Sequence, residues 1–440
     1  MGICVRWWTI FERKSKIIMM NTEEIVQVLK NHSDLSDYEY TKVTKNASEL
    51  FFVKKKMELN RVVNTDTVSI VVYKDVDDKR GSSMIAVTSA DDADSLNDKI
   101  TAAVKKAETA LNPYYPLASN QASLIKESAN KESLNAIALK AAEAIDEANQ
   151  SSESWLNATE IFVYVTRTEF LNSNDVHHVD TKLSVEFETI PTSSHNNEEF
   201  ESYKYYRNNT FDKASIEQDI RDILHLVKQR SIARTIDTVN ITKDTPLYMY
   251  GEMANLIAGN IMENTSYASH VTQSNHYDID KPVSNTKFDM ILKGQIEGAA
   301  NARAFDNHGV VLKETEIIHD GINTNLFGDI QYGHYLNAKE ITGSYPVAEI
   351  KAKNTVDALQ PHLIIDHFSA PQLESASGYF GGEVRLARYF DGEKYIPLTG
   401  FSITGNIYEA LQDVEFSSEN TTTQKYQGPK YFIFKNLNIA

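Results

Sequence analysis

Cysteine is nearly absent from this sequence of 440 residues, in which Cys4 is the only one. A single cysteine cannot form a disulfide within the chain, and it cannot supply a cluster of thiolate ligands to a metal ion. Because disulfides accumulate in oxidising compartments, this composition favours a cytoplasmic location. A hydrophobic share of 41% and a charged share of 24% are ordinary for a globular protein, so neither disorder nor a membrane protein is indicated.

A targeting signal is also lacking at the beginning of the sequence. Arg6 interrupts the only apolar run, and it stands where N-myristoylation requires Ser or Thr. The next residues instead read as the start of a helix, with Thr22 as the N-cap and two glutamates in the first turn. We therefore predict that translation starts at Met19 or Met20 rather than at Met1, which mass spectrometry of the native protein would test.

Basic residues are too few for a protein that binds nucleic acid over a broad surface. Lys and Arg number 44 against 61 Asp and Glu, which gives a formal net charge of −17. Such a surface repels phosphate backbones, so we expect no nucleic acid as a direct partner. The densest basic run, 54–56, lies in a strand-like segment and is interpreted as a solvated face.

Motifs for a serine or cysteine nucleophile are missing as well. No G-x-S-x-G motif occurs, and Cys4 lies in the segment that precedes the predicted start. Histidines are present but scattered, without the i,i+4 spacing of a helical metal site, and a scattered histidine usually makes a structural hydrogen bond. An alternative metal site stays a minor possibility for His177, His178, His270, His276, His308, His319, His334, His362 and His367, of which His367 follows Asp366.

Hydrophobic periodicity predicts an α+β fold. Alternation with period two predicts three strands, at 47–62, 66–75 and 81–90, and a hairpin whose turn is Asn172–Asp175. Apolar residues at helical spacing predict helices over 92–111, 132–149, 213–230 and 250–264. The polar segment 191–209 reads as an exposed excursion or a domain boundary.

Three parts follow from this pattern. We expect an upstream extension at 1–20, an N-terminal α+β domain with an antiparallel sheet and helices at 21–235, and a β-rich C-terminal domain at 236–440.

Four segments stand in the order typical of a known family. They are 47–62, the turn at 172–174, "AFDNHGVVLKETEIIHDGI" at 304–322 and, above all, "SGYFGGEVRLARYFDGEKYIPLTGFSITGN" at 377–406. In these segments the chain resembles the TldD/PmbA family, often labelled modulator of DNA gyrase, from about residue 22 to the end. The resemblance implies an α/β N-terminal domain and a barrel-like C-terminal domain. Asp175 departs from it, because the family often has Gly there.

Catalytic members of this family resemble zinc peptidases with H-E-x-x-x-H on a helix and a cysteine later in the chain. The two histidines would be metal ligands and the Glu a base acting on metal-bound water. Here the corresponding positions read Gly259, Asn260 and Asn264, and no cysteine follows Cys4. The resemblance is therefore to the PmbA/TldE-type subunit that lacks the zinc motif, and we expect no catalytic residue, no metal and no cofactor.

The glycine-rich stretch at 377–406 lies near the substrate cleft according to the resemblance. We expect Gly381, Gly382, Glu383 and Arg385 to bind substrate, with a peptide adding to an exposed strand edge. We further expect a positive φ at Gly382, and Glu383 and Arg385 on opposite faces of their strand. The alternative is a structural hairpin in which Glu383 pairs with a nearby Arg.

Two functions stay open at this point. The resemblance implies a non-catalytic subunit of a heteromeric zinc metallopeptidase that acts on unfolded or leader-bearing peptides, with a TldD-like zinc-bearing homologue as its partner. The alternative is a peptide-binding protein that associates with a second copy of itself. A neighbouring gene that encodes H-E-x-x-x-H would favour the first. A hydrolase with a new active site would need ionisable groups clustered in one cleft.

Overall fold

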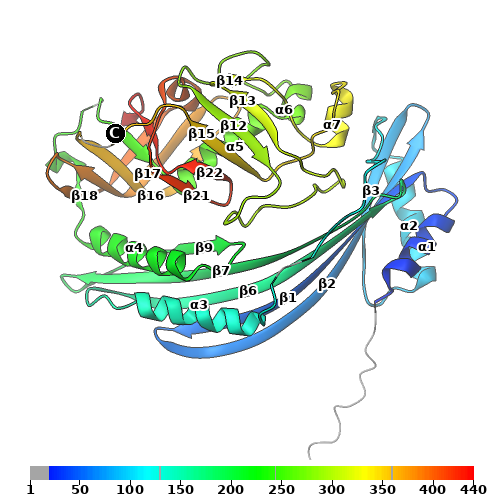
Figure 1. Ribbon diagram of the computed structural model, residues 1–440, viewed down its shortest axis with the longest axis horizontal. Coiled ribbons are helices and arrows are strands. Elements are labelled where there is room, and N and C mark those ends of the chain that lie inside the picture. Colours follow the sequence, from blue (N-terminus) through cyan, green and yellow to red (C-terminus); the bar gives the residue numbers. More distant parts are fainter. Residues whose placement is uncertain (1–18, 128–129, 243, 358–359) are drawn as a thin grey trace, which may run out of the picture. The chain divides into compact units, whose positions relative to one another are not determined.

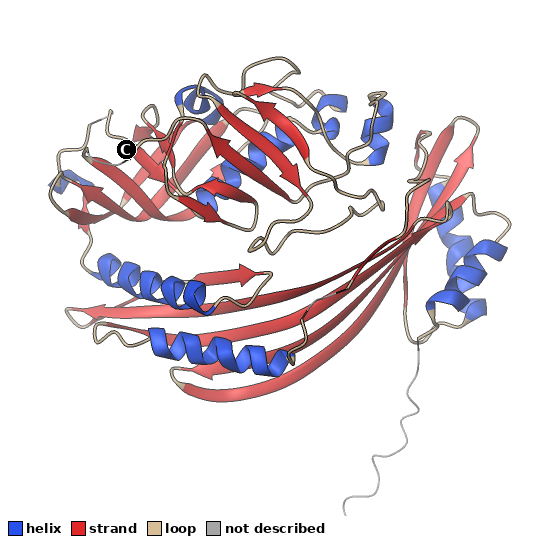
Figure 2. Cartoon of the chain, in the orientation of Figure 1, coloured by secondary structure: helices blue, strands red, loops and turns tan. Residues whose placement is uncertain are grey.

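The computed structural model describes residues 19–127, 130–242, 244–357 and 360–440. They form two compact units (Figures 1 and 2). The first comprises residues 19–44, Thr65–Ser123 and Thr168–His178, and the second comprises Lys45–Asn64, Leu124–Arg167 and Val179–Ala440. The domain boundary at 235/236 stays a prediction. The predicted upstream extension, 1–20, falls almost entirely outside the described residues.

The first sheet has the strand order β4-β3-β2-β1-β6-β7-β5, with β8 and β9 also paired to β7. Its strands are β1 (Asp37–Val53), β2 (Lys56–Val76), β3 (Lys79–Val87), β4 (Leu111–Pro113), β5 (Leu124–Lys126), β6 (Ser154–Asn172), β7 (His177–His195), β8 (Glu198–Glu201) and β9 (Lys204–Asn208). Segment 191–209, read from the sequence as an excursion or a boundary, therefore belongs largely to this sheet.

The three strands predicted from residue 47 onward are present, but the first turn lies elsewhere. The chain turns at Lys54, whose φ is +53°, and β2 then continues through the position where the sequence analysis placed a break. The basic run 54–56 thus forms the turn and the first residue of β2 instead of lying inside one strand, and it is exposed as expected. A β-turn needs few residues, and a run of lysines gives no periodicity that would reveal one.

The helix predicted to start near Thr22 and three of the four helices predicted from apolar spacing lie where the sequence analysis places them, and each buries its apolar stripe. They are α1 (Thr22–Asn31), α2 (Ala93–Ala107), α3 (Leu134–Ala148) and α4 (Lys213–Ser231). Helices α1 and α2 pack on the first unit's part of the sheet, and α3 and α4 share a second core with residues of β1, β6, β7 and β9. The N-cap of α1 is Asn21 instead of Thr22, because Asn21 and Glu24 exchange hydrogen bonds of 2.9 Å as a capping box.

The C-terminal region contains two further sheets. One has the order β10-β18-β17-β16-β11-β23-β20, with β19 paired to β17 and β24 paired to β19, and the other has the order β14-β13-β12-β15-β22-β21. The strands are β10 (Arg234–Thr235), β11 (Leu247–Met249), β12 (Phe288–Lys293), β13 (Thr315–His319), β14 (Ile322–Asn323), β15 (Val347–Ala352), β16 (His362–Leu373), β17 (Tyr379–Phe390), β18 (Tyr395–Thr399), β19 (Phe401–Asn406), β20 (Glu415–Phe416), β21 (Asn420–Thr422), β22 (Tyr426–Pro429), β23 (Phe432–Phe434) and β24 (Asn438–Ile439).

Helix α5 (Glu252–Asn264) packs in the core to which both of these sheets contribute. Three short helices, α6 (Tyr267–Val271), α7 (Ile330–Tyr335) and α8 (Ile407–Ala410), lie in the connections. The α+β class is confirmed. Over the described residues no sheet closes into a barrel, so the expected barrel-like domain consists of open sheets.

Among the helices that the structure describes, none combines the length and the apolar composition that a membrane crossing requires.

Candidate functional site

Helix α5 carries the three positions that correspond to the zinc motif. Gly251, with a φ of +59°, precedes the helix, and buried residues such as Ile257 and Ile261 hold it in the core. Asn260 and Asn264 lie one turn apart on the buried side, with exposed fractions of 3% and 1%. Their amides are therefore almost completely removed from water and must find hydrogen-bond partners within the protein.

Asn264 finds several such partners. Its Oδ1 accepts a hydrogen bond from the backbone N–H of His276 at 2.8 Å, and its Nδ2 donates to the backbone oxygen of Asn260 at 3.0 Å and to the hydroxyl of Tyr408 at 3.1 Å. The ring of His276 stacks on Tyr408, with the ring centroids 3.7 Å apart. Asn264 thus fixes the end of α5 against two other segments of the chain.

Asn260 begins a second chain of hydrogen bonds. Its Nδ2 donates to Ser375 Oγ at 3.1 Å, and Ser375 Oγ donates to Glu263 Oε2 at 2.8 Å. The Tyr408 hydroxyl donates to the backbone oxygen of Ser375, which joins the two chains. We call Asn260, Glu263, Asn264, Ser375 and Tyr408 the α5 polar cluster.

Two further features distinguish positions 259 and 260 from the filled position 264. Within the described residues, the buried Oδ1 of Asn260 has no hydrogen-bond partner. A Cβ atom added at Gly259 would meet no other atom within 4 Å. The helix could therefore accept a larger side chain at 259, whereas 264 is filled. Neutral amides at 260 and 264 are poor zinc ligands, because zinc prefers thiolate, imidazole and carboxylate groups.

The glycine-rich stretch meets the α5 polar cluster at both of its ends. Gly378, with a φ of +74°, lies so close to Tyr408 that an added Cβ would be 2.5 Å from the ring. At the other end, the backbone N–H of Tyr408 donates to Asn406 Oδ1 at 2.9 Å, and Asn406 Nδ2 donates to the backbone oxygen of Ser377 at 3.0 Å. The sequence analysis missed Ser375 and Tyr408, since serine and tyrosine carry no spacing signal. The structure thus brings together two regions that the sequence analysis treated separately.

Strand β17 forms the centre of this stretch, and two expectations about it are wrong. The strand is paired on both sides, to β16 along one edge and to β19 and then β18 along the other, so a peptide cannot add to its edge. Gly382 does not have a positive φ. A Cβ there would lie 2.7 Å from the ring of Phe368, so the glycine allows close packing. The glycines of this stretch that do have a positive φ are Gly378, Gly392 and Gly400, at +74°, +106° and +77°.

Glu383 and Arg385 lie on the same face of β17, which makes the expectation of opposite faces wrong. Residues two apart in a strand share a face. Arg385 Nη2 lies 3.2 Å from Glu383 Oε2, and it donates a hydrogen bond to Ser369 Oγ at 3.3 Å. Both side chains are about half exposed. This pairing fits the structural-hairpin alternative, and the substrate role of Gly381, Gly382, Glu383 and Arg385 stays a prediction.

A second arginine of β17 has a buried partner. Arg388 donates two hydrogen bonds to Asp366, at 2.7 and 2.8 Å, and the carboxylate of Asp366 is completely buried. The Tyr250 hydroxyl donates to the same carboxylate at 2.8 Å. Burial by itself would lower the pKa of Arg388, but the hydrogen bonds to Asp366 raise it above its usual value. Burial, followed by the charge of Asp366, raises the pKa of Tyr250 strongly. His367 does not take part in this pair.

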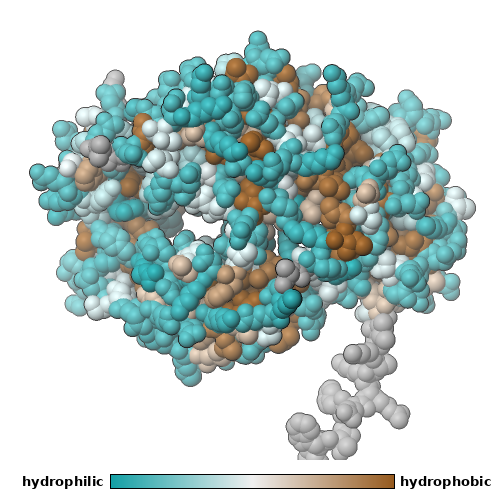
Figure 3. All heavy atoms as spheres, in the orientation of Figure 1, coloured by the Kyte–Doolittle hydropathy of each residue, from teal (hydrophilic) through white to brown (hydrophobic). Residues whose placement is uncertain are grey.

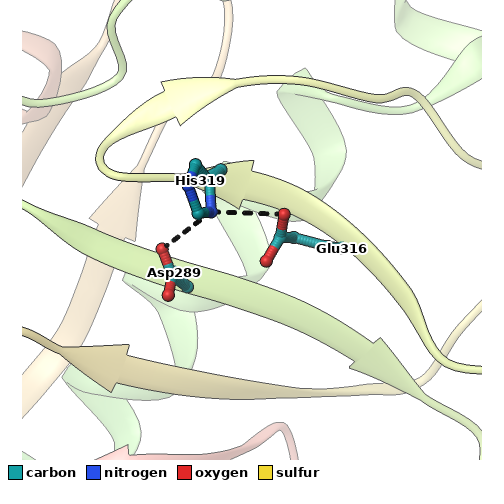
Figure 4. A group of neighbouring side chains, drawn as sticks. All are labelled: Asp289, Glu316 and His319. Atoms are coloured by element: carbon teal, nitrogen blue, oxygen red, sulfur yellow. Dashed lines mark ion pairs between the residues drawn. The ribbon is translucent and has the colours of Figure 1, made fainter.

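One group of possible metal ligands occurs among the described residues: Asp289, Glu316 and His319 (Figure 4). His319 Nδ1 lies 3.4 Å from Asp289 and 3.3 Å from Glu316, and His319 is about half exposed. The same Asp289 oxygen also accepts the ammonium of Lys353 at 3.0 Å and the backbone N–H of Asp320 at 2.9 Å. Because this oxygen already has several donors, the group is better explained as a surface network of ion pairs than as a metal site.

A cavity of about 560 Å³ opens in the third sheet, where β15 and β22 separate after two residue pairs. It is lined mainly by polar residues, among them Glu349, Ser417, Asn420 and Gln427. It shares no lining residue with the α5 polar cluster or with β17.

Comparison with known proteins gives one family match. Residues 247–440 match the model of the PmbA/TldA metallopeptidase C-terminal domain. No curated protein matches the chain.

Several solved structures share the fold. TldE from Thermococcus kodakarensis has a TM-score of 0.78 at 14% identity, and the match covers 95% of this chain and 100% of that one. A protein described as a candidate modulator of a DNA gyrase from Thermotoga maritima has a TM-score of 0.74 at 11% identity, covering 92% and 96%. A similarly described protein from Bacteroides thetaiotaomicron has a TM-score of 0.74 at 12% identity, covering 95% and 97%.

At these identities the structural likeness concerns the fold. It extends over nearly the full length of each chain, and the family model independently matches the region that contains α5 and β17. The resemblance to the TldD/PmbA family seen in the sequence is thereby confirmed: residues 247–440 match the family's C-terminal domain, and the fold of nearly the whole chain is that of the solved structures named above.

Proposed function

We propose that this chain is a non-catalytic subunit of a heteromeric zinc metallopeptidase, located in the cytoplasm, that processes or degrades unfolded or leader-bearing peptides. Its partner would be a zinc-bearing homologue of the TldD type. In that complex the zinc and the general base come from the partner, and this chain completes the substrate channel. Direct contact with nucleic acid is not part of the proposal, because the net charge is −17.

One observation carries this proposal. At the three positions of the zinc motif the chain has Gly259, Asn260 and Asn264, and the two amides are used in hydrogen bonds with the chain's own residues. A metal-binding helix would need ionisable ligands that point into an open site. The helix has instead been turned into a packing element of the core.

The family assignment supports the reaction class, since the matched model is named for a metallopeptidase domain. The likeness to a protein named TldE is consistent with a subunit of that type. Glu383 and Arg385 are half exposed on the strand next to the α5 polar cluster, where they could contact a peptide through their side chains. An added peptide strand on β17 itself is excluded by its pairing on both sides.

The experiment uses three samples: this chain, a homologue with H-E-x-x-x-H encoded in the same genome, and the two proteins mixed or expressed together. Each is incubated with an unstructured fluorogenic peptide, and complexes are separated by size. We expect no hydrolysis by this chain alone, and hydrolysis by a mixed complex that contains both proteins.

Hydrolysis by this chain alone would contradict the proposal. If the homologue works equally well without this chain and the two do not associate, the alternative of a self-associating peptide-binding protein would replace it. That alternative would then be tested by binding of the same peptide to this chain.

A further inference from the structure

A cavity of about 270 Å³ lies between the turn that joins β1 to β2, helix α3 and strand β6. All of its lining residues belong to the second unit. Its apolar wall includes Phe52, Leu156 and Ile161, and Met57, which is 39% exposed, continues this wall toward the surface. Sites for drug-sized ligands measure about 300 to 1,000 Å³, so this cavity suits a smaller molecule with an apolar body.

Apolar side chains are exposed in the same part of the second unit. Val53, next to the turn, is 54% exposed, and Leu139 of α3 is 45% exposed. Figure 3 shows a hydrophobic area in the lower part of the visible face, over the arc that β1 and β2 form in Figure 1. An exposed apolar surface often belongs to a binding site.

Asn149 places a polar group in the wall of the cavity. It is the C-cap residue of α3 and is 9% exposed. Its backbone N–H donates to Ile145 and Asp146, but within the described residues its side-chain amide has no hydrogen-bond partner. The amide is not among the fully enclosed atoms that lack a partner, so it faces the cavity. An amide both donates and accepts, and it therefore suits a ligand group that does the same, such as a peptide bond.

The rim of the cavity carries one unpaired charge of each sign. Lys55 and Asp146 form an ion pair of 3.0 Å that joins the β1–β2 turn to α3. Lys54 in the turn and Glu143, about one helical turn before Asp146, also line the cavity. Both are exposed, and over the part of the chain that the structure describes their side chains form no ion pair or hydrogen bond. A ligand with a carboxylate and an ammonium group complements this rim, whereas an acid or an amine alone meets a like charge.

We infer that this cavity binds a short apolar peptide with free ends, about the size of a dipeptide. The apolar side chains of the ligand enter the cavity, and Asn149 bonds to its peptide group. Its carboxylate lies toward Lys54 and its ammonium group toward Glu143. The cavity shares no lining residue with the α5 polar cluster or with β17, and the inference does not rest on the proposed peptidase function.

The first test measures binding of leucyl-leucine to the whole chain by isothermal titration calorimetry. We expect one molecule bound per chain. Ala142→Leu fills the cavity, which Ala142 lines, and should weaken binding at least tenfold. Ala136→Leu is the matched control, because Ala136 lies in the same helix outside the cavity, and it should leave binding unchanged. Thermal melts check that both variants are folded.

The second test assigns the polar contacts. Asn149→Ala should weaken binding of leucyl-leucine about two- to tenfold, the range of one neutral hydrogen bond. Lys54→Ala should weaken it up to about fivefold, as for an exposed ion pair, and should not affect leucyl-leucine amide, which lacks the carboxylate. Glu143→Ala should likewise weaken leucyl-leucine and leave N-acetyl-leucyl-leucine, which lacks the ammonium group, unaffected.

Octanoate, an apolar carboxylate without an ammonium group, is the comparison ligand and should bind more weakly than leucyl-leucine. The inference is overturned if leucyl-leucine does not bind at millimolar concentrations, or if it binds Ala142→Leu as well as the unchanged chain. It is also overturned if octanoate binds more tightly and Glu143→Ala does not weaken leucyl-leucine, because the cavity is then a site for apolar carboxylates.

Discussion

Strand β17 carries two arginines three residues apart, and they show what distinguishes a structural charge from an available one. Arg388 pairs with the completely buried Asp366, which also accepts the hydroxyl of Tyr250. Arg385 pairs with Glu383, and both of these side chains are about half exposed. A buried pair cannot lose one member without leaving a charge in a poor solvent, whereas an exposed pair exchanges its partner for water. The residues available for contact with a peptide are therefore Glu383 and Arg385.

The amides of the α5 polar cluster, like the Arg388–Asp366 pair, are buried and have structural partners. Its amides are inaccessible and hold Ser375, Tyr408 and the backbone of His276. The part of α5 that would bind zinc in a catalytic relative thus stabilises the fold of this chain. The following predictions test this contrast, from the largest expected effect to the smallest.

The largest effect is expected for Asp366→Ala. It leaves the guanidinium of Arg388 and the hydroxyl of Tyr250 without their buried partner, so the free energy of unfolding should fall by about 3 to 5 kcal/mol. Urea denaturation of the variant and of the unchanged chain measures this. A loss below about 1 kcal/mol, as for an exposed pair, would show that Arg388 finds water or another acceptor.

The next effect concerns rebuilding the zinc motif with Gly259→His, Asn260→Glu and Asn264→His together. The free energy of unfolding should fall by about 1 to 3 kcal/mol, because the hydrogen bonds of Asn264 are removed inside the core. Metal binding should be weak at most, since the third ligand and its supporting residues are missing.

The control for this variant is Gly259→His alone. It meets open space, and it replaces a helical glycine, so stability should stay the same or rise by up to about 1 kcal/mol. Strong peptidase activity of the triple variant would mean that the site is more complete than its hydrogen bonds suggest.

Two glycines of the stretch at 377–406 should respond to alanine for different reasons. Gly382→Ala pushes a methyl group against the ring of Phe368 and should lower stability by about 1 to 3 kcal/mol. In Gly400→Ala the added methyl group contacts no other atom, but alanine must adopt a positive φ. This should lower the free energy of unfolding by about 1 to 2 kcal/mol. Adding Phe368→Leu should recover part of the loss in the first variant and none in the second. Equal recovery in both would contradict the steric explanation.

Stability should also depend on pH through His362, which is 1% exposed. Burial lowers the pKa of His362, with a smaller contribution from the charge of Arg388. A histidine whose folded pKa is lowered contributes stability above its unfolded pKa of about 6.5, and this contribution is lost as the pH falls below that value. The melting temperature should therefore drop between pH 7.5 and 5.5, and by less in His362→Gln. If the melting temperature of His362→Gln drops as much between pH 7.5 and 5.5 as that of the unchanged chain, His362 is excluded as a cause.

The smallest effect on stability is expected for Glu383→Ala and Arg385→Ala, at about 0.2 to 1 kcal/mol each. If these residues contact the peptide, both variants should lower hydrolysis by the mixed complex while their melting curves stay nearly unchanged. Unaltered hydrolysis in both would leave β17 a purely structural strand.

The sequence predicted helices, strands and turns better than it predicted which of them lie next to one another in space. Long amphipathic helices such as α2, α3 and α4 follow from periodicity alone, and the left-handed turn residue Asp175, with a φ of +59°, follows from turn chemistry, since Asp tolerates this conformation. The absence of His and Glu at the three motif positions of α5, 259, 260 and 264, could also be read from the residues. The partners of Asn260 and Asn264 could not, because Ser375 and Tyr408 are more than one hundred residues away in sequence.

Two of the wrong expectations, those about Gly382 and about the edge of β17, have the same origin. The role of Gly382 depends on Phe368 in the neighbouring strand, and the accessibility of the β17 edge depends on the pairing of β19. Such facts belong to the packing of segments, which a single sequence does not display. The common face of Glu383 and Arg385, by contrast, follows from the two-residue period of a strand and could have been deduced.

The most direct test of the central claim is the zinc content of the purified chain, measured by mass spectrometry of the metal after mild chelator treatment. Because Gly259, Asn260 and Asn264 offer no zinc ligand and the two amides are occupied by hydrogen bonds, the account predicts well below one zinc ion per chain. One tightly held zinc ion per chain would contradict it.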